Sequence, residues 1–198
     1  MSELSSHTDA ELWISFAKGG NKESFSAFYK QNYSLLFSYG VSLGMNEEHI
    51  RDTIQELFLK LYTKPHIIKE LSTIRAFLFT SIRYAFINNE KVRNRRFNYE
   101  EIKNFELNYS VEYNQLEDEE EAQLLQNRID KIIESLTPRQ KEIIYLRFLH
   151  QMDYEEIAKV MNMSNQAARN LTHRAMEKIR KDNSDIIVLL FLFSLLSK

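Results

Sequence analysis

Apolar residues recur at intervals of three and four positions along most of this chain, which is the spacing of amphipathic helices. One such stripe comprises Phe25, Phe28, Tyr29, Leu36 and Phe37, and a second comprises Ile50, Ile54, Leu57, Phe58 and Leu61. No segment alternates apolar and polar residues as a half-buried strand would. The 198 residues include only four Gly and two Pro, so few turns interrupt the helices. The pattern predicts an all-α protein.

Four helices are expected in the first half. Thr8 and Glu11 form a capping-box pattern that opens the first helix, and Gly19 and Gly20 end it. The second helix ends between Gly40 and Gly44. The third runs from about 47 to 62, before Pro65, and the fourth from about 73 to 96.

Charge is divided along the chain, although the net charge is only −2. Residues 75–96 hold six basic side chains and one acidic, residues 101–123 hold one basic and eight acidic, and residues 137–181 hold nine basic and five acidic. An acidic run of this kind is typical of a solvated linker. We therefore expect two small helical domains, 8–98 and 124–182, joined by an acidic linker, 99–123, and followed by an apolar tail, 183–198.

The last third predicts a helix-turn-helix. Thr137 and Pro138 open one helix, Asp153 and Glu156 cap a short second one, and Ser164 caps the last, after a turn at Asn162. Asn tolerates the left-handed backbone conformation that such a turn requires. The last helix is basic on its outer face, as in helices that enter the major groove of DNA.

Segments 135–144 (SLTPRQKEII), 154–158 (YEEIA) and 169–175 (RNLTHRA) resemble region four of the extracytoplasmic-function sigma factors. LuxR-type regulators share part of this pattern, so these segments leave both families open. Residues 52–62 (DTIQELFLKLY) resemble region two of the same sigma factors, and the expected strands of a LuxR-type receiver domain are missing. The chain is therefore similar to an RNA polymerase sigma factor of the sigma-70 family, with a LuxR-type regulator as the alternative.

The resemblance implies three sets of functional residues. The polymerase-binding set is Asp52, Gln55, Glu56 and Lys60. The set for recognition and melting of the −10 promoter element is Arg83, Tyr84, Asn88, Arg93, Arg95 and Arg96. The set for the −35 element is Asn165, Gln166, Arg169, Asn170, His173, Arg174 and Lys178. Of these, Arg169 is expected to contact bases, and Arg174 and Lys178 to contact phosphates. Ala167 and Ala168 replace a Thr-Val pair frequent in the family, which removes one hydroxyl that phosphate could bind.

The expected partners are core RNA polymerase, double- and single-stranded promoter DNA and, by resemblance, a membrane-bound anti-sigma factor. We expect no enzyme activity, no cofactor and no metal, because the five His are dispersed and no Cys or phosphate-binding glycine loop is present. A protein-interaction adaptor that uses the acidic segment is a further alternative. Without a signal sequence, the chain is expected in the cytoplasm. The apolar tail, Ile186 to Leu196, is short of the roughly 20 residues that span a bilayer, and a short packed helix is expected there.

Overall fold

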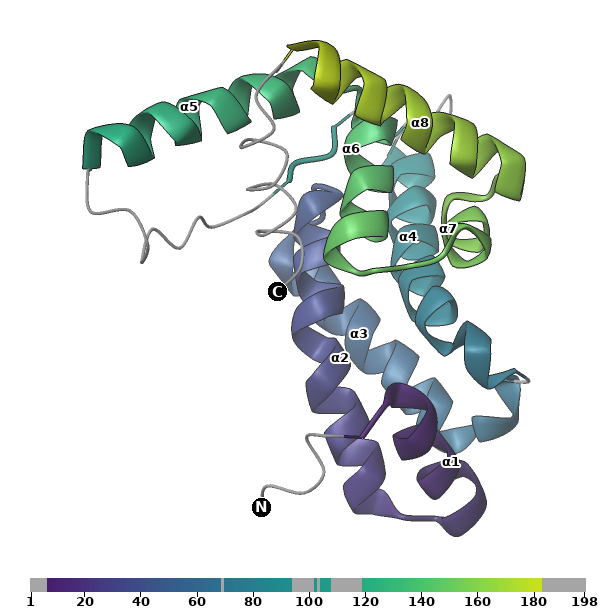
Figure 1. Ribbon diagram of the computed structural model, residues 1–198. Helices are drawn as coiled ribbons and strands as arrows, with labels where there is room; N and C mark the ends of the chain where they lie inside the picture. The colour runs from purple at the N-terminus through teal and green to yellow at the C-terminus, as the bar shows by residue number, and fades with distance from the viewer. Residues whose placement is uncertain (1–6, 69, 94–101, 103, 108–118, 183–198) are drawn as a thin grey trace. The chain divides into compact units, whose positions relative to one another are not determined.

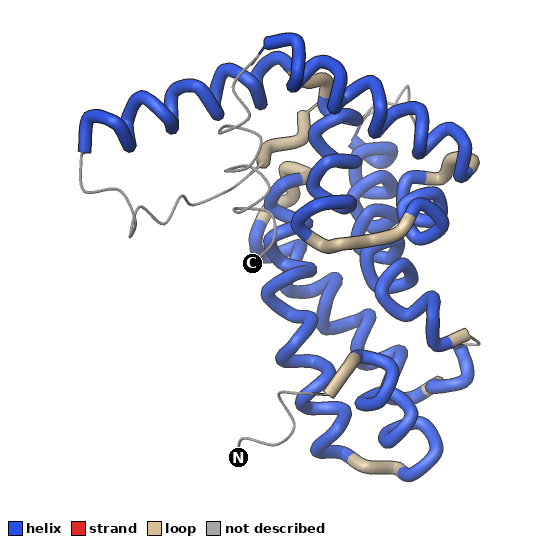
Figure 2. Tube along the Cα trace, in the orientation of Figure 1, coloured by secondary structure: helices blue, strands red, loops and turns tan. Residues whose placement is uncertain are grey.

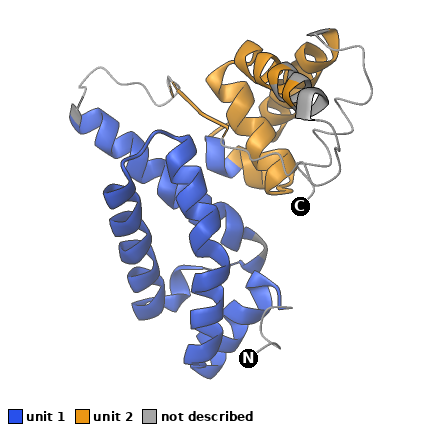
Figure 3. Ribbon diagram, turned by 90° about the vertical axis from the view of Figure 1, so that its left-hand side faces the viewer, with its two compact units in different colours: residues 1–101, 159–161 blue, residues 102–158, 162–198 orange. Residues whose placement is uncertain are grey.

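The computed structural model describes residues 7–68, 70–93, 102, 104–107 and 119–182. Throughout these ranges the regular structure is helical, and no strand occurs in them (Figures 1 and 2). The all-α prediction is confirmed. The chain divides into two compact units, shown in Figure 3. Unit 1 comprises Met1–Glu101 and Lys159–Met161, and unit 2 comprises Ile102–Ala158 and Asn162–Lys198.

Unit 1 contains the four predicted helices. They are α1 (Asp9–Gly19), α2 (Lys22–Ser42), α3 (Glu47–Thr63) and α4 (Ile74–Arg93), with short 3-10 turns at Pro65–Ile67 and Leu71–Thr73. The capping box at α1 is formed as predicted: the Thr8 backbone N–H donates to Glu11 Oε2 at 2.8 Å, and the Glu11 N–H donates to Thr8 Oγ1 at 3.3 Å. The Thr8 backbone N–H and the Thr8 hydroxyl both donate to Glu11 Oε2, and these two bonds hold the pKa of the Glu11 carboxyl below its usual value. Local sequence signals therefore set where this helix begins.

Aromatic side chains from three helices pack together in the core of unit 1. The Phe28 ring lies 5.4 Å from that of Trp13 on α1 and 5.7 Å from that of Phe58 on α3, centroid to centroid. Further along, α2 and α3 approach closely at Gly40, where a Cβ atom would lie 2.8 Å from Ile50 Cγ1. This packing fixes one face of α3 against the bundle and leaves its opposite face at the surface.

Unit 2 contains α5 (Glu119–Ser135), α6 (Pro138–Ile144), a π turn (Tyr145–Leu149), α8 (Asn165–Asp182) and all but the last three residues of α7 (Tyr154–Met161). Helices α5 and α6 both pack against α8. The predicted capping boxes at Thr137 with Gln140 and at Asp153 with Glu156 are both formed. The predicted helix-turn-helix is thus present as α7 and α8.

Part of the predicted acidic linker belongs to unit 2. Ile102 and Phe105 are buried, and the Phe105 ring makes an edge-to-face contact with Tyr145, with 5.5 Å between centroids. Helix α5 starts at Glu119, inside the segment predicted as linker. The apolar tail, Ile186 to Leu196, lies outside the described residues. Among the described helices, none combines the length and apolar composition needed to cross a membrane.

Candidate functional site

The predicted polymerase-binding residues share the outer face of α3. Asp52, Gln55, Glu56 and Lys60 are all exposed, while Ile50, Ile54, Leu57, Phe58 and Leu61 are buried on the other face. Leu59, which is not among the residues predicted from the sequence, is 65% exposed on the same helix. Leu59 stands three and four positions after Glu56 and Gln55, so it lies beside them on the helix surface. The sequence already contained this information, because the helical spacing places an apolar residue on an otherwise polar face.

Helix α4 carries the predicted −10 residues, and only some of them are accessible. Tyr84 and Asn88 are exposed one turn apart, and Val92, exposed to 85%, continues the same face. Arg83 departs from the prediction because its side chain is only 3% exposed, so it does not present its guanidinium group to DNA in this conformation. The Arg93 side chain, Arg95 and Arg96 lie outside the described part of the structure.

The turn between α7 and α8 depends on Asn162. Its backbone is left-handed, with φ 50° and ψ 59°, and its N–H donates to the Ala158 carbonyl. The Met163 N–H donates to the same carbonyl at 3.0 Å. Ser164 Oγ then accepts from the Ala167 N–H at 3.1 Å and caps α8. These bonds satisfy backbone groups at the ends of both helices and fix the direction of α8.

The outer face of α8 displays six of the seven residues predicted for the −35 element, and all six are exposed: Asn165, Gln166, Arg169, Asn170, His173 and Arg174. Hydrogen bonds between side chains one helical turn apart hold the side chains of this face in place. Gln166 Nε2 donates to Asn170 Oδ1 at 2.9 Å, and Arg169 Nε donates to Asn165 Oδ1 at 2.8 Å. His173 Nδ1 lies 3.4 Å from a Glu177 carboxylate oxygen. The helix therefore offers a row of amide, imidazole and guanidinium donors, which are the groups that contact base edges and phosphates.

Lys178 departs from the predicted phosphate contact. Its side chain is half-buried, and the ammonium group donates to the backbone carbonyl of Ser135, the last residue of α5. The helix C-terminus leaves carbonyl groups without intrahelical partners, and a cation there satisfies one of them. Lys178 thus joins α8 to α5.

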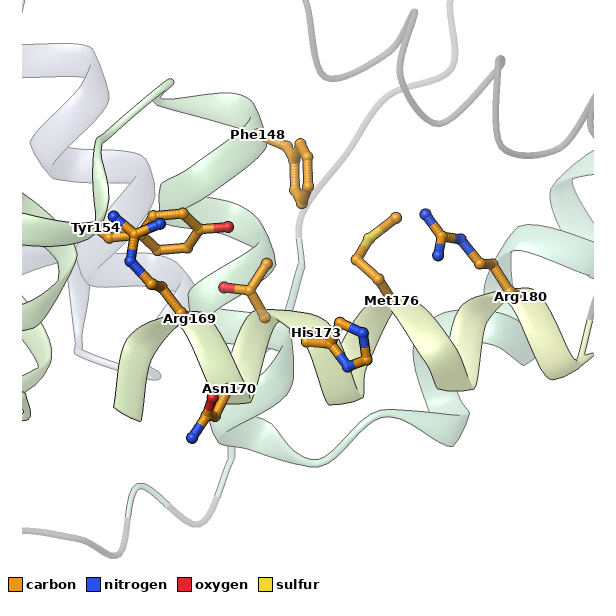
Figure 4. Close-up of a pocket in the computed structure, with 8 residues that line it drawn as sticks. Phe148, Tyr154, Arg169, Asn170, His173, Met176 and Arg180 are labelled. Atoms are coloured by element: carbon orange, nitrogen blue, oxygen red, sulfur yellow. The ribbon is translucent and has the colours of Figure 1, made fainter. Parts of the chain in front are cut away.

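A hollow of about 440 Å³ lies beside α8 in unit 2 (Figure 4). The apolar side chains Phe148 and Met176 line it, together with Tyr154, Arg169, Asn170, Thr172, His173 and Arg180. Figure 4 shows the Arg169 guanidinium group against the Tyr154 ring. No cluster of His, Asp or Glu that could hold a metal occurs among the residues that the structure describes.

Comparisons with known proteins agree with this geometry. Residues 126–179 match the family model for Sigma-70, region 4. The RNA polymerase sigma factor YlaC of Bacillus subtilis is 24% identical over 162 residues, which cover 82% of this chain and 93% of YlaC. The RNA polymerase sigma factor TcsR of Paraclostridium sordellii is 29% identical over 114 residues, 57% of this chain and 61% of TcsR.

The solved structure of CnrH in complex with the cytosolic domain of CnrY has a similar fold, with a TM-score of 0.53 and 21% identity, over 87% of this chain and 95% of that one. A LuxR-type regulator is not favoured, because α1–α4 stand where the strands of a receiver domain would be required. Residues 126–179 therefore form a Sigma-70 region 4 domain, and over 82% of its length the chain is similar to an RNA polymerase sigma factor.

Proposed function

We propose that this sigma factor binds core RNA polymerase through the outer face of α3 and directs promoter-specific initiation through α4 and α8. The main support for this proposal is the exposed face of α3. Five neighbouring side chains, Asp52, Gln55, Glu56, Leu59 and Lys60, are exposed on a helix whose other face is held by the core. An exposed apolar side chain surrounded by polar ones matches the usual arrangement of a protein interface, in which an apolar centre has a polar rim.

The two DNA contacts follow from different chemistry. Helix α8 presents donors suited to base edges and phosphates of double-stranded DNA, so we assign it to the −35 element. Helix α4 presents Tyr84 beside Asn88, and an exposed aromatic ring can stack on an unpaired base. We therefore assign Tyr84 and Asn88 to the melted −10 element. The phosphates of the −10 element would be neutralised by three arginines, Arg93, Arg95 and Arg96. The buried Arg83 would have a structural role in α4 instead of contacting DNA.

The decisive experiment is in vitro transcription from a promoter library with core polymerase, in the presence and absence of this chain. Promoter-specific transcripts that require the chain support the proposal. Transcription that the chain leaves unchanged, under conditions in which another sigma factor is active with the same core, contradicts it. Heparin chromatography at increasing salt distinguishes DNA binding from the alternative role as a protein-interaction adaptor. Binding at low salt that is lost steeply as the salt concentration rises supports DNA binding, because basic DNA-binding surfaces lose affinity in this way.

An anti-sigma factor is the third proposed partner. The structural relative CnrH was solved with the cytosolic domain of CnrY, and this chain shares the fold of CnrH. We propose that a membrane-anchored protein of that kind sequesters this sigma factor in the cytoplasm. Purification of the chain from its native cell extract, followed by identification of membrane proteins that copurify with it, tests this partner.

A further inference from the structure

The Tyr154 ring contacts two arginines, Arg147 of the π turn before α7 and Arg169 of α8. Tyr154 is the first residue of α7, directly after the cap Asp153. The Arg169 Cζ atom on α8 lies 4.6 Å from the centroid of this ring, and the Arg147 Cζ atom lies 4.9 Å from the same centroid. Both distances are within the range of cation–π attraction. The ring therefore contacts a guanidinium group of the helix that faces DNA.

The surroundings of Tyr154 fix both guanidinium groups. Arg147 Nη1 donates to the Met152 carbonyl at 2.7 Å, so Arg147 is tied to the backbone of the loop before α7. Arg169 Nε donates to Asn165 Oδ1 at 2.8 Å. Arg169 is held on one side by an aromatic face and on another by an amide, although its side chain is exposed. Its terminal nitrogens, Nη1 and Nη2, donate to no group in the described part of the chain.

Two parallel N–H donors on a planar fork are what the O6 and N7 acceptors of guanine require in the major groove. A free arginine side chain loses rotamer freedom when it forms such a pair, and a side chain already held in one conformation loses less. We infer that Tyr154 is a positioning residue for Arg169, and that the pair sets a preference for guanine at one position of the −35 element. This inference rests on the proposed function, since it requires α8 to contact promoter DNA.

The test compares Tyr154→Leu, Tyr154→Phe and Arg169→Ala in the complete holoenzyme, on promoters randomised across the −35 element. Arg169→Ala should abolish the preference for guanine at one position. Tyr154→Leu should reduce that preference about three-fold, the effect of losing one exposed cation–π contact, while most of the initiation from the other sequences is kept. Tyr154→Phe keeps the ring and should behave as the wild type does.

The double variant Tyr154→Leu, Arg169→Ala separates positioning from a structural role. If Tyr154 acts through Arg169, the leucine substitution has no further effect on base preference once Arg169 is absent. Phe37→Leu is the matched control, because Phe37 on α2 makes a comparable contact with Arg51 within unit 1, 5.5 Å from Cζ to the ring centroid. This control should leave the preference unchanged.

Three outcomes would overturn the inference: an Arg169→Ala variant that keeps the preference, a Tyr154→Leu variant that weakens all promoters equally, or additive effects in the double variant. None of these results affects the proposed function as long as the wild-type chain directs promoter-specific initiation. A wild-type chain that fails to direct initiation contradicts the proposed function first.

Discussion

The ammonium group of Lys178 on α8 donates a hydrogen bond to the backbone carbonyl of Ser135, 43 positions earlier in the chain. Lys178→Met should therefore destabilise unit 2 by about 1 kcal/mol, since a cation at a helix C-terminus contributes up to that amount. For a domain of this size the expected decrease in melting temperature is about 4–8 °C. Lys181→Met is the control, because it removes the same charge from an exposed position on α8. A loss of DNA affinity without a change in melting temperature would instead favour a phosphate contact.

The single tryptophan allows the two units to be followed separately. Trp13 is buried in the core of unit 1, so its fluorescence reports the unfolding of that unit alone. Circular dichroism reports the helices of both units. The Lys178→Met variant should shift the dichroism transition and leave the Trp13 transition unchanged. A shift in both would mean that the units unfold together.

Asn162 is the second test of unit 2. Its left-handed conformation costs a β-branched side chain about 1–2 kcal/mol, so Asn162→Val should destabilise the unit by that amount. Asn162→Gly should be neutral or stabilise it by up to about 1 kcal/mol, because glycine adopts this conformation without strain. Urea unfolding followed by circular dichroism measures both. Equal stability of the valine and glycine variants would contradict this explanation of the turn.

The double variant Gln55→Ala, Glu56→Ala should fold normally and bind core polymerase about 30-fold more weakly, the effect of losing about 2 kcal/mol at an interface centre. Both side chains are exposed and neither contributes to the core. Equilibrium binding to fluorescently labelled core polymerase is the measurement. Glu23→Ala with Gln31→Ala, exposed on α2, is the matched control. Binding of the test variant at wild-type strength would contradict the assignment of α3.

Leu59→Gln tests the apolar centre of the same face. Because Leu59 is largely exposed in the free protein, this change should alter stability by less than about 0.5 kcal/mol. Burial of the leucine at an interface is worth about 1.5–3 kcal/mol, so affinity for core polymerase should fall by roughly ten-fold or more. The same binding assay, together with a thermal melt, separates the two effects. A destabilised variant with unchanged affinity would mean that Leu59 serves the fold instead.

The features that could be predicted from the sequence are those determined by neighbouring residues. The capping boxes at Thr8, Thr137 and Asp153 each depend on a partner three positions away, and all three form. The exposed faces of α3 and α8 follow from helical periodicity. Asn162 also takes the backbone conformation expected of it.

The features that escaped prediction depend on contacts between distant segments. The hydrogen bond of Lys178 joins residues far apart in sequence, and so does the packing of Phe105 on Tyr145. Arg83 lies in a basic segment, where charge alone favours the surface, yet its side chain is buried. A long side chain with an aliphatic stem can be covered along its length, which no pattern of charges indicates.

The packing of Phe105 on Tyr145 shortens the connection between the units. Helix α4 ends at Arg93 in unit 1, and eight residues of the sequence, 94–101, separate it from Ile102, where unit 2 begins. A chain of eight residues reaches about 30 Å at full extension. Once one unit is bound, a tether this short keeps the other at an effective concentration of the order of millimolar, provided that the tether can span the two binding sites. Weak individual contacts with a promoter would then suffice for tight joint recognition, and lengthening the tether would weaken it without altering any contact.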